Sequence, residues 1–530
     1  MDTDGCIRAR LLVDRRYSIC RIQGISLVET NNTKRIAVIG AGVAGLATAR
    51  QLLGKGFDCT LFERNEVLGG VWSDGYLNFG AQIQRELYEF PDWSLPEGTP
   101  NFTPGPIIQK YLQDYADHYG ISSKIRFNTQ VTSLAETDSS DNGWTLTLEN
   151  ESGISEEHFD LVVICIGLYS NTPNIPDFAE RDKFHGEVMH NSLLKSDEQL
   201  NGKRVAVIGY GKSASDAALE AAKVAAQTHI IFRDPHWPIP QKLAGILPFK
   251  WGLLNRLCST LIPVYQDTTP VERVVHSVGK PLAWLYWRIV ETLFYFQFGL
   301  GSRFGTRVSL VPKLPVEIDA FGESTQVPES DFFRLARSGE IGLHRTSIEK
   351  FTGTGLKLAN GETLDLDTVI LATGWKTDFS FMSPDVWTRL DPGDDGFYLY
   401  RHMINPKVPG LFFVGRAATI SSILTSSLQA RWLVDVLTEK VQLPPVEEMT
   451  DNIERMKAWK QSWMPFSPAR SARLIAHIQH YHDELLKDLG ENPLRKTGFF
   501  APLKELIFPY EPRDYASIVS VERENGAESN

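Results

Sequence analysis

Cysteine is scarce in this chain, which has five among 530 residues, at positions 6, 20, 59, 165 and 258. They form neither a C-x-x-C pair nor the spacing of a zinc site, which argues against a disulfide framework and favours a reducing compartment. His477, His480 and His482 lie close together, but only the first two share a helix face. Two ligands do not make a metal site, so we expect no metal and place these histidines at the surface or over a substrate cleft.

Positive charge is also in deficit. Lysine and arginine number 54 against 65 aspartates and glutamates, a net charge of −11. No basic stripe is present to follow a phosphate backbone, so we expect no nucleic acid as a partner.

Long apolar runs are missing as well. The first 34 residues have no apolar core of the signal-peptide type, and we expect residues 1–34, like the polar tail 521–530, to be disordered. The nearest approach to a membrane span is 281–300, which Arg288 and Glu291 interrupt. It favours a buried or half-buried helix, while an interfacial helix or the wall of an apolar tunnel stays open. We therefore expect a cytoplasmic protein, with peripheral membrane contact through 281–300 as an open alternative.

Two glycine-rich loops stand out against these absences. The first lies in KRIAVIGAGVAGLATA, where Gly40, Gly42 and Gly45 are spaced as G-x-G-x-x-G, and Glu63 ends the next apolar stretch. In a strand–turn–helix unit such glycines let a pyrophosphate approach the helix N-terminus. A carboxylate at the next strand end accepts hydrogen bonds from ribose hydroxyls. The pattern predicts a first dinucleotide site.

The second loop lies in KRVAVIGYGKSASD, with Gly209 and Gly211 followed by Lys212, Ser213 and Ala214. Here the next apolar stretch, HIIFR, ends in Arg233 instead of a carboxylate. A guanidinium at that place suits a 2′-phosphate. The chain is thus expected to bind two different dinucleotides, the second phosphorylated, which indicates a redox enzyme.

Two further segments indicate how the domains are arranged. Residues 159–176 and 366–378 each run from an apolar strand into a turn of small residues, with Thr373 and Gly374 in the second. Such segments are typical of crossovers between domains. We predict an α/β fold with two Rossmann-like dinucleotide-binding domains, one inserted into the other, and a helical C-terminal region. The predicted ranges are 35–177 plus 366–440 for the first domain, 178–365 for the second, about 240–330 for an aromatic-rich insertion within it, and 441–520 for the helical region.

The combination of motifs resembles the class B flavin-containing monooxygenases of the dimethylaniline monooxygenase type. It comprises the two glycine loops, GGVW at 69–72, FHGEVMH at 184–190 and LATGW at 371–375. The resemblance covers roughly residues 35–440. It implies that NADPH reduces FAD, that O2 adds to the flavin C(4a), and that retained NADP⁺ shields the peroxide from water. A soft nucleophile or a carbonyl then takes one oxygen atom, while the protein supplies orientation and a dry cavity.

The resemblance assigns residues to each cofactor. For FAD they are Gly40, Gly42, Gly45, Glu63, Gly70 and Trp72. For NADPH they are Gly209, Gly211, Lys212, Ser213 and Arg233, and Thr373 and Gly374 are further cofactor-binding candidates.

The chain departs from the family pattern at three places. Gln82, in Gln-Ile-Gln-Arg, stands where many relatives have an asparagine near the flavin, and Lys212 stands where asparagine is common. Leu194 replaces an aromatic residue that the Baeyer–Villiger form of the motif has as tryptophan. We take Gln82 and His190 as candidate catalytic residues, with bracing of the interdomain linker as the alternative role of His190.

Several functions remain open. The leading one is an FAD- and NADPH-dependent monooxygenase acting on O2 and a small, apolar organic molecule of specialised metabolism. The alternative is Baeyer–Villiger oxidation of a ketone. A flavoprotein disulfide reductase would need a cysteine pair beside the flavin, and a non-catalytic nucleotide-binding scaffold would have no use for both Glu63 and Arg233. The sequence leaves the substrate, the reaction type and the oligomeric state open.

Overall fold

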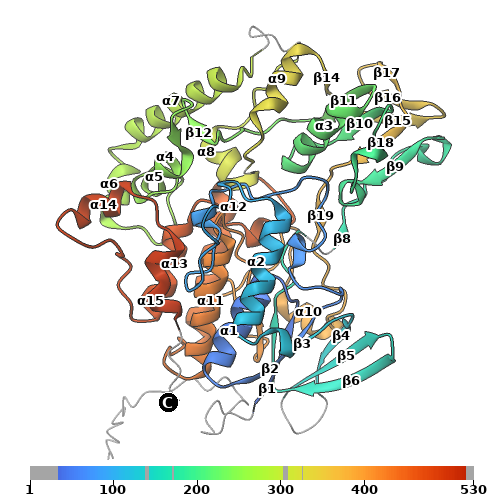
Figure 1. The fold of residues 1–530 in the computed structure, drawn as a ribbon. Coiled ribbons are helices and arrows are strands. Elements are labelled where there is room, and N and C mark those ends of the chain that lie inside the picture. Colours follow the sequence, from blue (N-terminus) through green and yellow to red (C-terminus); the bar gives the residue numbers. More distant parts are fainter. Residues whose placement is uncertain (1–33, 138–142, 170–171, 302–307, 325, 521–530) are drawn as a thin grey trace, which may run out of the picture.

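The computed structural model describes residues 34–137, 143–169, 172–301, 308–324 and 326–520. The segments predicted to be disordered, 1–34 and 521–530, lie outside these ranges apart from Lys34. Figure 1 shows two sheet units, with helices covering both and a group of helices beside them.

The first unit is built on a parallel five-stranded sheet of order β20-β7-β1-β2-β3. Alternate residues of β1 face opposite clusters: Ile36 and Val38 pack into one, Ala37 and Ile39 into the other. Burial on both faces explains why the strand reads as an unbroken apolar run. The sheet strands are β1 (Arg35–Ile39), β2 (Asp58–Phe62), β3 (Ile125–Arg126), β7 (Leu161–Ile164) and β20 (Leu411–Phe413).

Helices and a small antiparallel sheet complete this unit. Helix α1 (Val43–Gly54) links β1 to β2 and packs against α11 (Ser422–Leu437). The other elements are α2 (Gly105–His118), α10 (Pro384–Leu390), β4 (Gln130–Glu136), β5 (Trp144–Asn150) and β6 (Gly153–Phe159).

The second unit repeats this plan, with a parallel sheet of order β14-β11-β10-β18-β9. Helix α3 (Lys212–Val224) takes the place of α1, and α9 (Ser330–Ser338) packs against it. The parallel strands are β9 (Glu187–His190), β10 (Arg204–Ile208), β11 (Gln227–Phe232), β14 (Ile341–Arg345) and β18 (Thr368–Leu371), and the small antiparallel sheet is β15 (Ile348–Thr352), β16 (Gly355–Leu358) and β17 (Thr363–Asp365).

The structure corrects the boundary that we placed at residue 366. Strand β18 hydrogen-bonds to β10 and β9, so it belongs to the second sheet and not to the first. The chain crosses between the units along β8 (Thr172–Pro173) and returns along β19 (Trp375–Lys376), and these two strands pair antiparallel. The apolar strand that we assigned to the first domain is therefore the last strand of the second.

Between β11 and β14 the chain forms an additional, mostly helical layer. Its elements are β12 (Lys242–Leu243), β13 (Leu247–Pro248), α4 (Phe249–Leu253), α5 (Arg256–Leu261), α6 (Pro270–Val275), α7 (Lys280–Phe298), α8 (Val316–Ile318) and the π-helical turn η8 (Asp319–Glu323). Helix α7 covers the segment 281–300 and is half-buried, with Trp287 and Phe294 inside and Leu282 and Ile289 exposed. Among the described residues, no helix is both long and apolar enough to cross a membrane.

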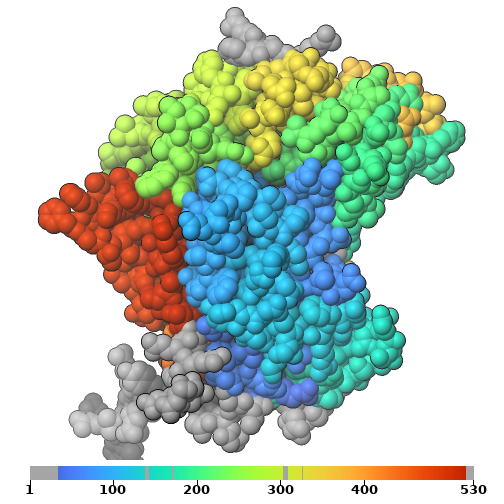
Figure 2. All heavy atoms as spheres, viewed as in Figure 1, coloured from blue at the N-terminus to red at the C-terminus, as the bar shows by residue number. Residues whose placement is uncertain are grey.

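The C-terminal helices lie beside the first unit and the helical layer. They are α12 (Val446–Trp463), α13 (Ile478–Asp488), α14 (Ala501–Ile507) and α15 (Ala516–Val519). Figure 2 shows the segment that carries α13, α14 and α15, in red, meeting the helical layer, in yellow-green. Arg256 of α5 joins the two parts through a bidentate contact, with guanidinium nitrogens 2.7 and 2.8 Å from the Asp483 carboxylate oxygens.

Gly45 marks the tightest contact between a glycine loop and its helix. A Cβ atom on Gly45 would lie 2.0 Å from the carbonyl oxygen of Gly40. The equivalent position of the second unit has Ala214, whose side chain is fully buried. The first loop therefore sits closer to its helix than the second, and only glycine fits there.

We predict that Gly45→Ala lowers the thermal unfolding midpoint by several degrees, because overpacking of this kind costs about 1–3 kcal/mol. The matched control is Ala214→Gly, which removes a methyl group and should cost about 1 kcal/mol through helix propensity and packing. Differential scanning fluorimetry measures both. A Gly45→Ala protein as stable as the parent would contradict the close approach.

Candidate cofactor and substrate cavity

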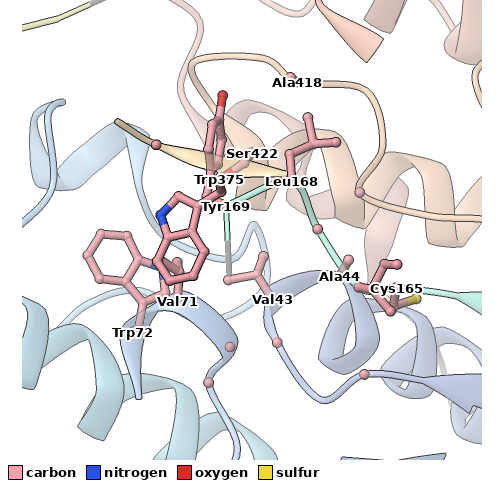
Figure 3. Close-up of a pocket in the computed structure, with 18 of the residues that line it drawn as sticks. Val43, Ala44, Val71, Trp72, Cys165, Leu168, Tyr169, Trp375, Ala418 and Ser422 are labelled. Carbon is pink, nitrogen blue, oxygen red and sulfur yellow. The ribbon is translucent and has the colours of Figure 1, made fainter. Parts of the chain in front are cut away.

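A cavity of about 1060 Å³ extends along the junction of the two units. Its lining includes residues of both glycine loops, the 69–72 turn, the crossover residues Thr373 and Gly374, and aromatic side chains. Figure 3 shows Trp72, Tyr169 and Trp375 gathered on one side of it, with Ala44 and Cys165 on the other. One cavity thus reaches both predicted dinucleotide sites.

The first glycine loop has the shape that a dinucleotide requires. Gly42 precedes α1 with φ −81°, and a Cβ atom there would lie 3.5 Å from the Cα atom of Gly70. Glu63 is buried, and its carboxylate accepts hydrogen bonds from the amides of Ala41 (2.9 Å) and Asn65 (3.0 Å). Gly40, Gly42, Glu63, Gly70 and Trp72 all line the cavity. Two opposed glycines beside a fixed carboxylate fit the pyrophosphate and ribose of FAD.

The second loop is similar in backbone but different in charge. Gly211 precedes α3 with φ −81°, and a Cβ atom there would meet no atom within 4 Å. Gly211, Lys212 and Ser213 line the cavity. The ammonium of Lys212 lies 2.5 Å from both oxygens of Asp216, and Asp216 also accepts a hydrogen bond of 2.7 Å from the Tyr76 hydroxyl of the first unit. The open backbone fits a dinucleotide, while the charge of Lys212 is already paired.

Arg233 directly follows β11 and is exposed. It stands beyond the strand next to β10, as Glu63 stands beyond the strand next to β1. It does not line the cavity. A contact of Arg233 with a 2′-phosphate would therefore lie on the outer side of the nucleotide site.

His190 does not line the cavity either. Its Nε2 lies 3.1 Å from the carbonyl oxygen of Gly374, and its Nδ1 lies 2.9 Å from the hydroxyl of Ser192. Burial lowers the pKa of His190, which favours the neutral ring. Both nitrogens are occupied, so this geometry does not support our catalytic assignment and favours a brace for the crossover strand.

Gln82 lines the cavity, and its side-chain oxygen accepts a hydrogen bond of 3.0 Å from the Val327 amide. It thus ties the first unit to the segment that follows η8. Nearby, the indole N–H of Trp72 donates to the Tyr88 hydroxyl at 2.9 Å, and the indole stacks on Phe79 with ring centroids 5.8 Å apart.

Sequence reasoning missed many polar residues of the cavity lining, among them His236, Glu323 and Arg473. His236 lies three residues beyond Arg233, in a stretch that we interpreted only for its arginine. Nothing in the sequence connects it to Glu323 or Arg473, which are distant along the chain.

The histidine group at 477–482 differs from our expectation of a surface position. His477 and His482 are buried, and burial lowers the pKa of each to about 3. Their Nε2 atoms lie 2.8 Å from the Pro263 carbonyl and 2.9 Å from the Thr425 hydroxyl, and His480 contacts Glu272. The three rings hold α13 to neighbouring segments.

Comparison with known proteins identifies the family of this chain. The profile of the family described as flavin-binding monooxygenase-like matches residues 33–276 and 335–501. A probable flavin-containing monooxygenase 1 of Arabidopsis thaliana is 32% identical over 91% of this chain and 96% of its own.

Solved structures share the fold. The S-allyl-L-cysteine S-oxygenase of Allium sativum is 20% identical with a TM-score of 0.59, over 89% of this chain and 91% of its own. A steroid monooxygenase bound to NADP is 20% identical with a TM-score of 0.64, over 86% of this chain and 98% of its own. With the family match, these findings confirm the resemblance drawn from the motifs and the α/β fold. This chain belongs to the flavin-binding monooxygenase-like family, as an NADPH-dependent flavin monooxygenase whose cofactors are FAD and NADPH.

Proposed function

We propose that this enzyme inserts one atom of O2 into a small, largely apolar organic molecule, in a step of specialised metabolism. The observation that carries the proposal is the single cavity lined by both glycine loops and by aromatic side chains. Electrons from NADPH, a flavin and an apolar acceptor would all meet in that space. Two structurally similar proteins, an S-allyl-L-cysteine S-oxygenase and a steroid monooxygenase, support a small organic acceptor, and the second supports an apolar one.

We assign the residues to roles as follows. The loop from Gly40 to Gly45, with Glu63, Gly70 and Trp72, holds FAD, and the loop from Gly209 to Ser213 holds NADPH beside Thr373 and Gly374. When bound, reduced FAD supplies the chemistry that activates O2. Gln82 and the aromatic walls orient the acceptor and exclude water from it. His190 and Ser192 hold the crossover at Gly374 in place.

Baeyer–Villiger oxidation of a ketone remains the alternative reaction. Leu194, where that form of the motif has tryptophan, is fully buried, and its carbonyl accepts a hydrogen bond of 2.7 Å from the Leu77 amide. It joins the two units and does not line the cavity. The absence of the motif's tryptophan, and not the position of Leu194, favours oxidation of a heteroatom or a carbon centre.

Peripheral membrane contact through α7 also remains a proposal. It is supported by apolar side chains exposed on that helix and near it, among them Leu282, Trp284, Leu285, Ile289 and Val278. A patch of this kind on a half-buried helix is typical of an interaction surface.

The function is tested by a matched pair of variants, Gly42→Val and Gly211→Val. Both glycines have φ −81°, so valine strains neither backbone and acts only by filling space. The parent should purify with FAD and oxidise NADPH with consumption of O2. Gly42→Val should lose the flavin, whereas Gly211→Val should stay yellow and show at least a tenfold higher Michaelis constant for NADPH. Absorbance spectra and oxygen-electrode kinetics measure both, and full flavin retention in Gly42→Val would refute the placement.

Arg233 should decide between NADPH and NADH. We predict that Arg233→Ala raises the Michaelis constant for NADPH about tenfold and leaves that for NADH nearly unchanged, because one charge-assisted contact with the 2′-phosphate is lost. Arg334→Ala is the control, since Arg334 is an exposed arginine of the same unit that pairs with Asp331. Equal losses with both nucleotides would make Arg233 a structural residue.

For Gln82 we predict that Gln82→Ala retains FAD and flavin reduction but yields less product and more hydrogen peroxide per NADPH, with thioanisole as acceptor. An amide that stabilises developing charge in a dry site is worth a few kcal/mol. Gln82→Glu keeps an acceptor for the Val327 amide and removes the amide donors, so it should also uncouple the reaction.

Gln84→Ala is the control in the same loop, because Gln84 is buried but does not line the cavity. If Gln82→Ala only lowers the melting temperature and coupling is unchanged in both Gln82 variants, Gln82 has no role at the site.

A further inference from the structure

A cluster of ionisable side chains lies at the wall of the cavity, next to the helical layer. It contains His236 beyond β11, Asp319 and Glu323 at the two ends of η8, and Arg473 between α12 and α13. His236, Glu323 and Arg473 line the cavity, and a ring nitrogen of His236 and carboxylate oxygens of Asp319 and Glu323 lie within 4.8 Å of one another. None of the roles assigned above uses these residues.

His236 and Asp319 form a fixed hydrogen-bonded pair. Nδ1 of His236 lies 2.8 Å from one carboxylate oxygen of Asp319, and the amide of Trp237 donates to the other at 2.6 Å. The side chain of Asp319 is only 3% exposed. Because a carboxylate only accepts, Nδ1 carries the proton. The neutral ring therefore keeps its Nε2 lone pair for a ligand.

The backbone around the pair is held as well. The indole N–H of Trp237 donates to the Leu314 carbonyl at 2.8 Å, and the Ile239 amide donates to the Gln326 carbonyl at 2.9 Å. Gln326 precedes Val327, and the amide of Val327 donates a hydrogen bond to the side-chain oxygen of Gln82. The pair is thus anchored to the segment that Gln82 contacts from the opposite unit.

Charged groups around His236 counteract the effect of burial on its pKa. Burial acts to lower the pKa of His236, but the hydrogen bond and charge of Asp319, with the charge of Glu323, outweigh it, and Arg473 opposes them. The result is a pKa raised above the usual value of a histidine. His236 is therefore protonated in acid and becomes a hydrogen-bond acceptor as the pH rises through that pKa.

The composition of the cluster matches an acid–base pair better than a cation site. Both oxygens of Asp319 are already hydrogen-bonded, and Arg473 adds positive charge beside Glu323. A histidine oriented by a buried carboxylate is the arrangement that proteins use to accept a proton from a bound group.

The side chains of the cavity wall indicate what kind of carbon skeleton carries that group. Aromatic side chains line the cavity, among them Trp72, Tyr76, Phe79, Tyr88 and Trp375. Flat rings pack against such walls in stacked or edge-on contacts. A planar ligand would leave its polar edge for the charged cluster.

We propose that the substrate carries an acidic hydroxyl on an aromatic or conjugated frame, a phenol or an enol, and that His236 binds and deprotonates it. The hydroxyl donates to Nε2, the proton moves to Nε2, and the electron pair of the O–H bond stays on the substrate oxygen. Asp319 is a positioning residue that stabilises the resulting imidazolium. The inference rests on the proposed oxygen insertion, because the deprotonated frame is the more nucleophilic acceptor of oxygen.

The test compares 4-methoxyphenol with 1,4-dimethoxybenzene on the FAD-loaded enzyme, by equilibrium dialysis without NADPH. An apolar cavity alone would bind the diether at least as tightly, because the phenol is better solvated by water. We expect the phenol to bind about tenfold more tightly at the alkaline end of a pH series, below the pKa of the phenol itself, where His236 is neutral. That preference should fall as the pH drops through the pKa of His236, since the imidazolium no longer accepts a hydrogen bond from the phenol.

Variants assign the effect to the pair. His236→Gln should abolish the pH dependence, because an amide does not titrate, and should reduce the preference, because its amide oxygen is a weaker acceptor than the imidazole nitrogen. Asp319→Asn should do the same with His236 still present, since the tautomer is no longer held. His344→Gln is the control: Nδ1 of His344 lies 2.9 Å from a carboxylate oxygen of Glu362, but His344 is on β14 and does not line the cavity. It should behave like the parent.

The proposal is overturned if the parent shows no preference for the phenol, if His236→Gln keeps a pH-dependent preference, or if Glu323→Gln abolishes it while His236→Gln does not. Flavin content and melting temperature, measured on each variant, identify misfolding, and the pH profile of the parent needs no variant. FAD binding and NADPH oxidation are measured apart from this binding, so failure here is distinguishable from failure of the proposed function.

Discussion

The relative orientation of the two sheet units depends on the pairing of the two segments that cross between them. Strands β8 and β19 form a short antiparallel ladder, with Trp375 opposite Pro173 and Lys376 opposite Thr172. The side chain and carbonyl of Asn174 exchange hydrogen bonds of 3.0 and 2.5 Å with Thr373. His190 holds Gly374 from the second unit. A single linker would leave the units free to turn, whereas two paired ones restrict their relative orientation.

That orientation brings two helix N-termini to one space. Gly42 and Gly211 precede α1 and α3, and both line the cavity. Each N-terminus offers free amides and the positive end of a helix dipole to an anionic ligand. Two dinucleotides can then meet over a common interior.

Further polar contacts connect the two units across their junction. Tyr76 reaches Asp216, and Lys195 lies 2.5 Å from a carboxylate oxygen of Asp74. Gln82 reaches the segment beyond η8. Of these contacts, the exposed Lys195–Asp74 ion pair contributes about 1 kcal/mol or less to stability. They fit an interface that admits a cofactor and still keeps its register.

The sequence by itself determined the features that depend on neighbours along the chain. The two strand–turn–helix loops, the glycines in them, and Glu63 and Arg233 at the next strand ends could all be predicted, because a turn and its helix N-terminus are built from consecutive residues. The α/β class and the family followed from the same motifs. Gly45 belongs here too, since the carbonyl that excludes its side chain lies only five residues away.

Only the tertiary structure decided which distant segments meet. An apolar strand carries no mark of the sheet it joins, so β18 was assigned to the wrong unit. His190 and the histidines of α13 gained their partners from other segments, which pattern reasoning cannot place. The same holds for Lys212, whose partner Asp216 is shared with Tyr76. His236 and Asp319 lie 83 residues apart, and their contact arises from the packing of η8 against the segment beyond β11, which no local preference encodes.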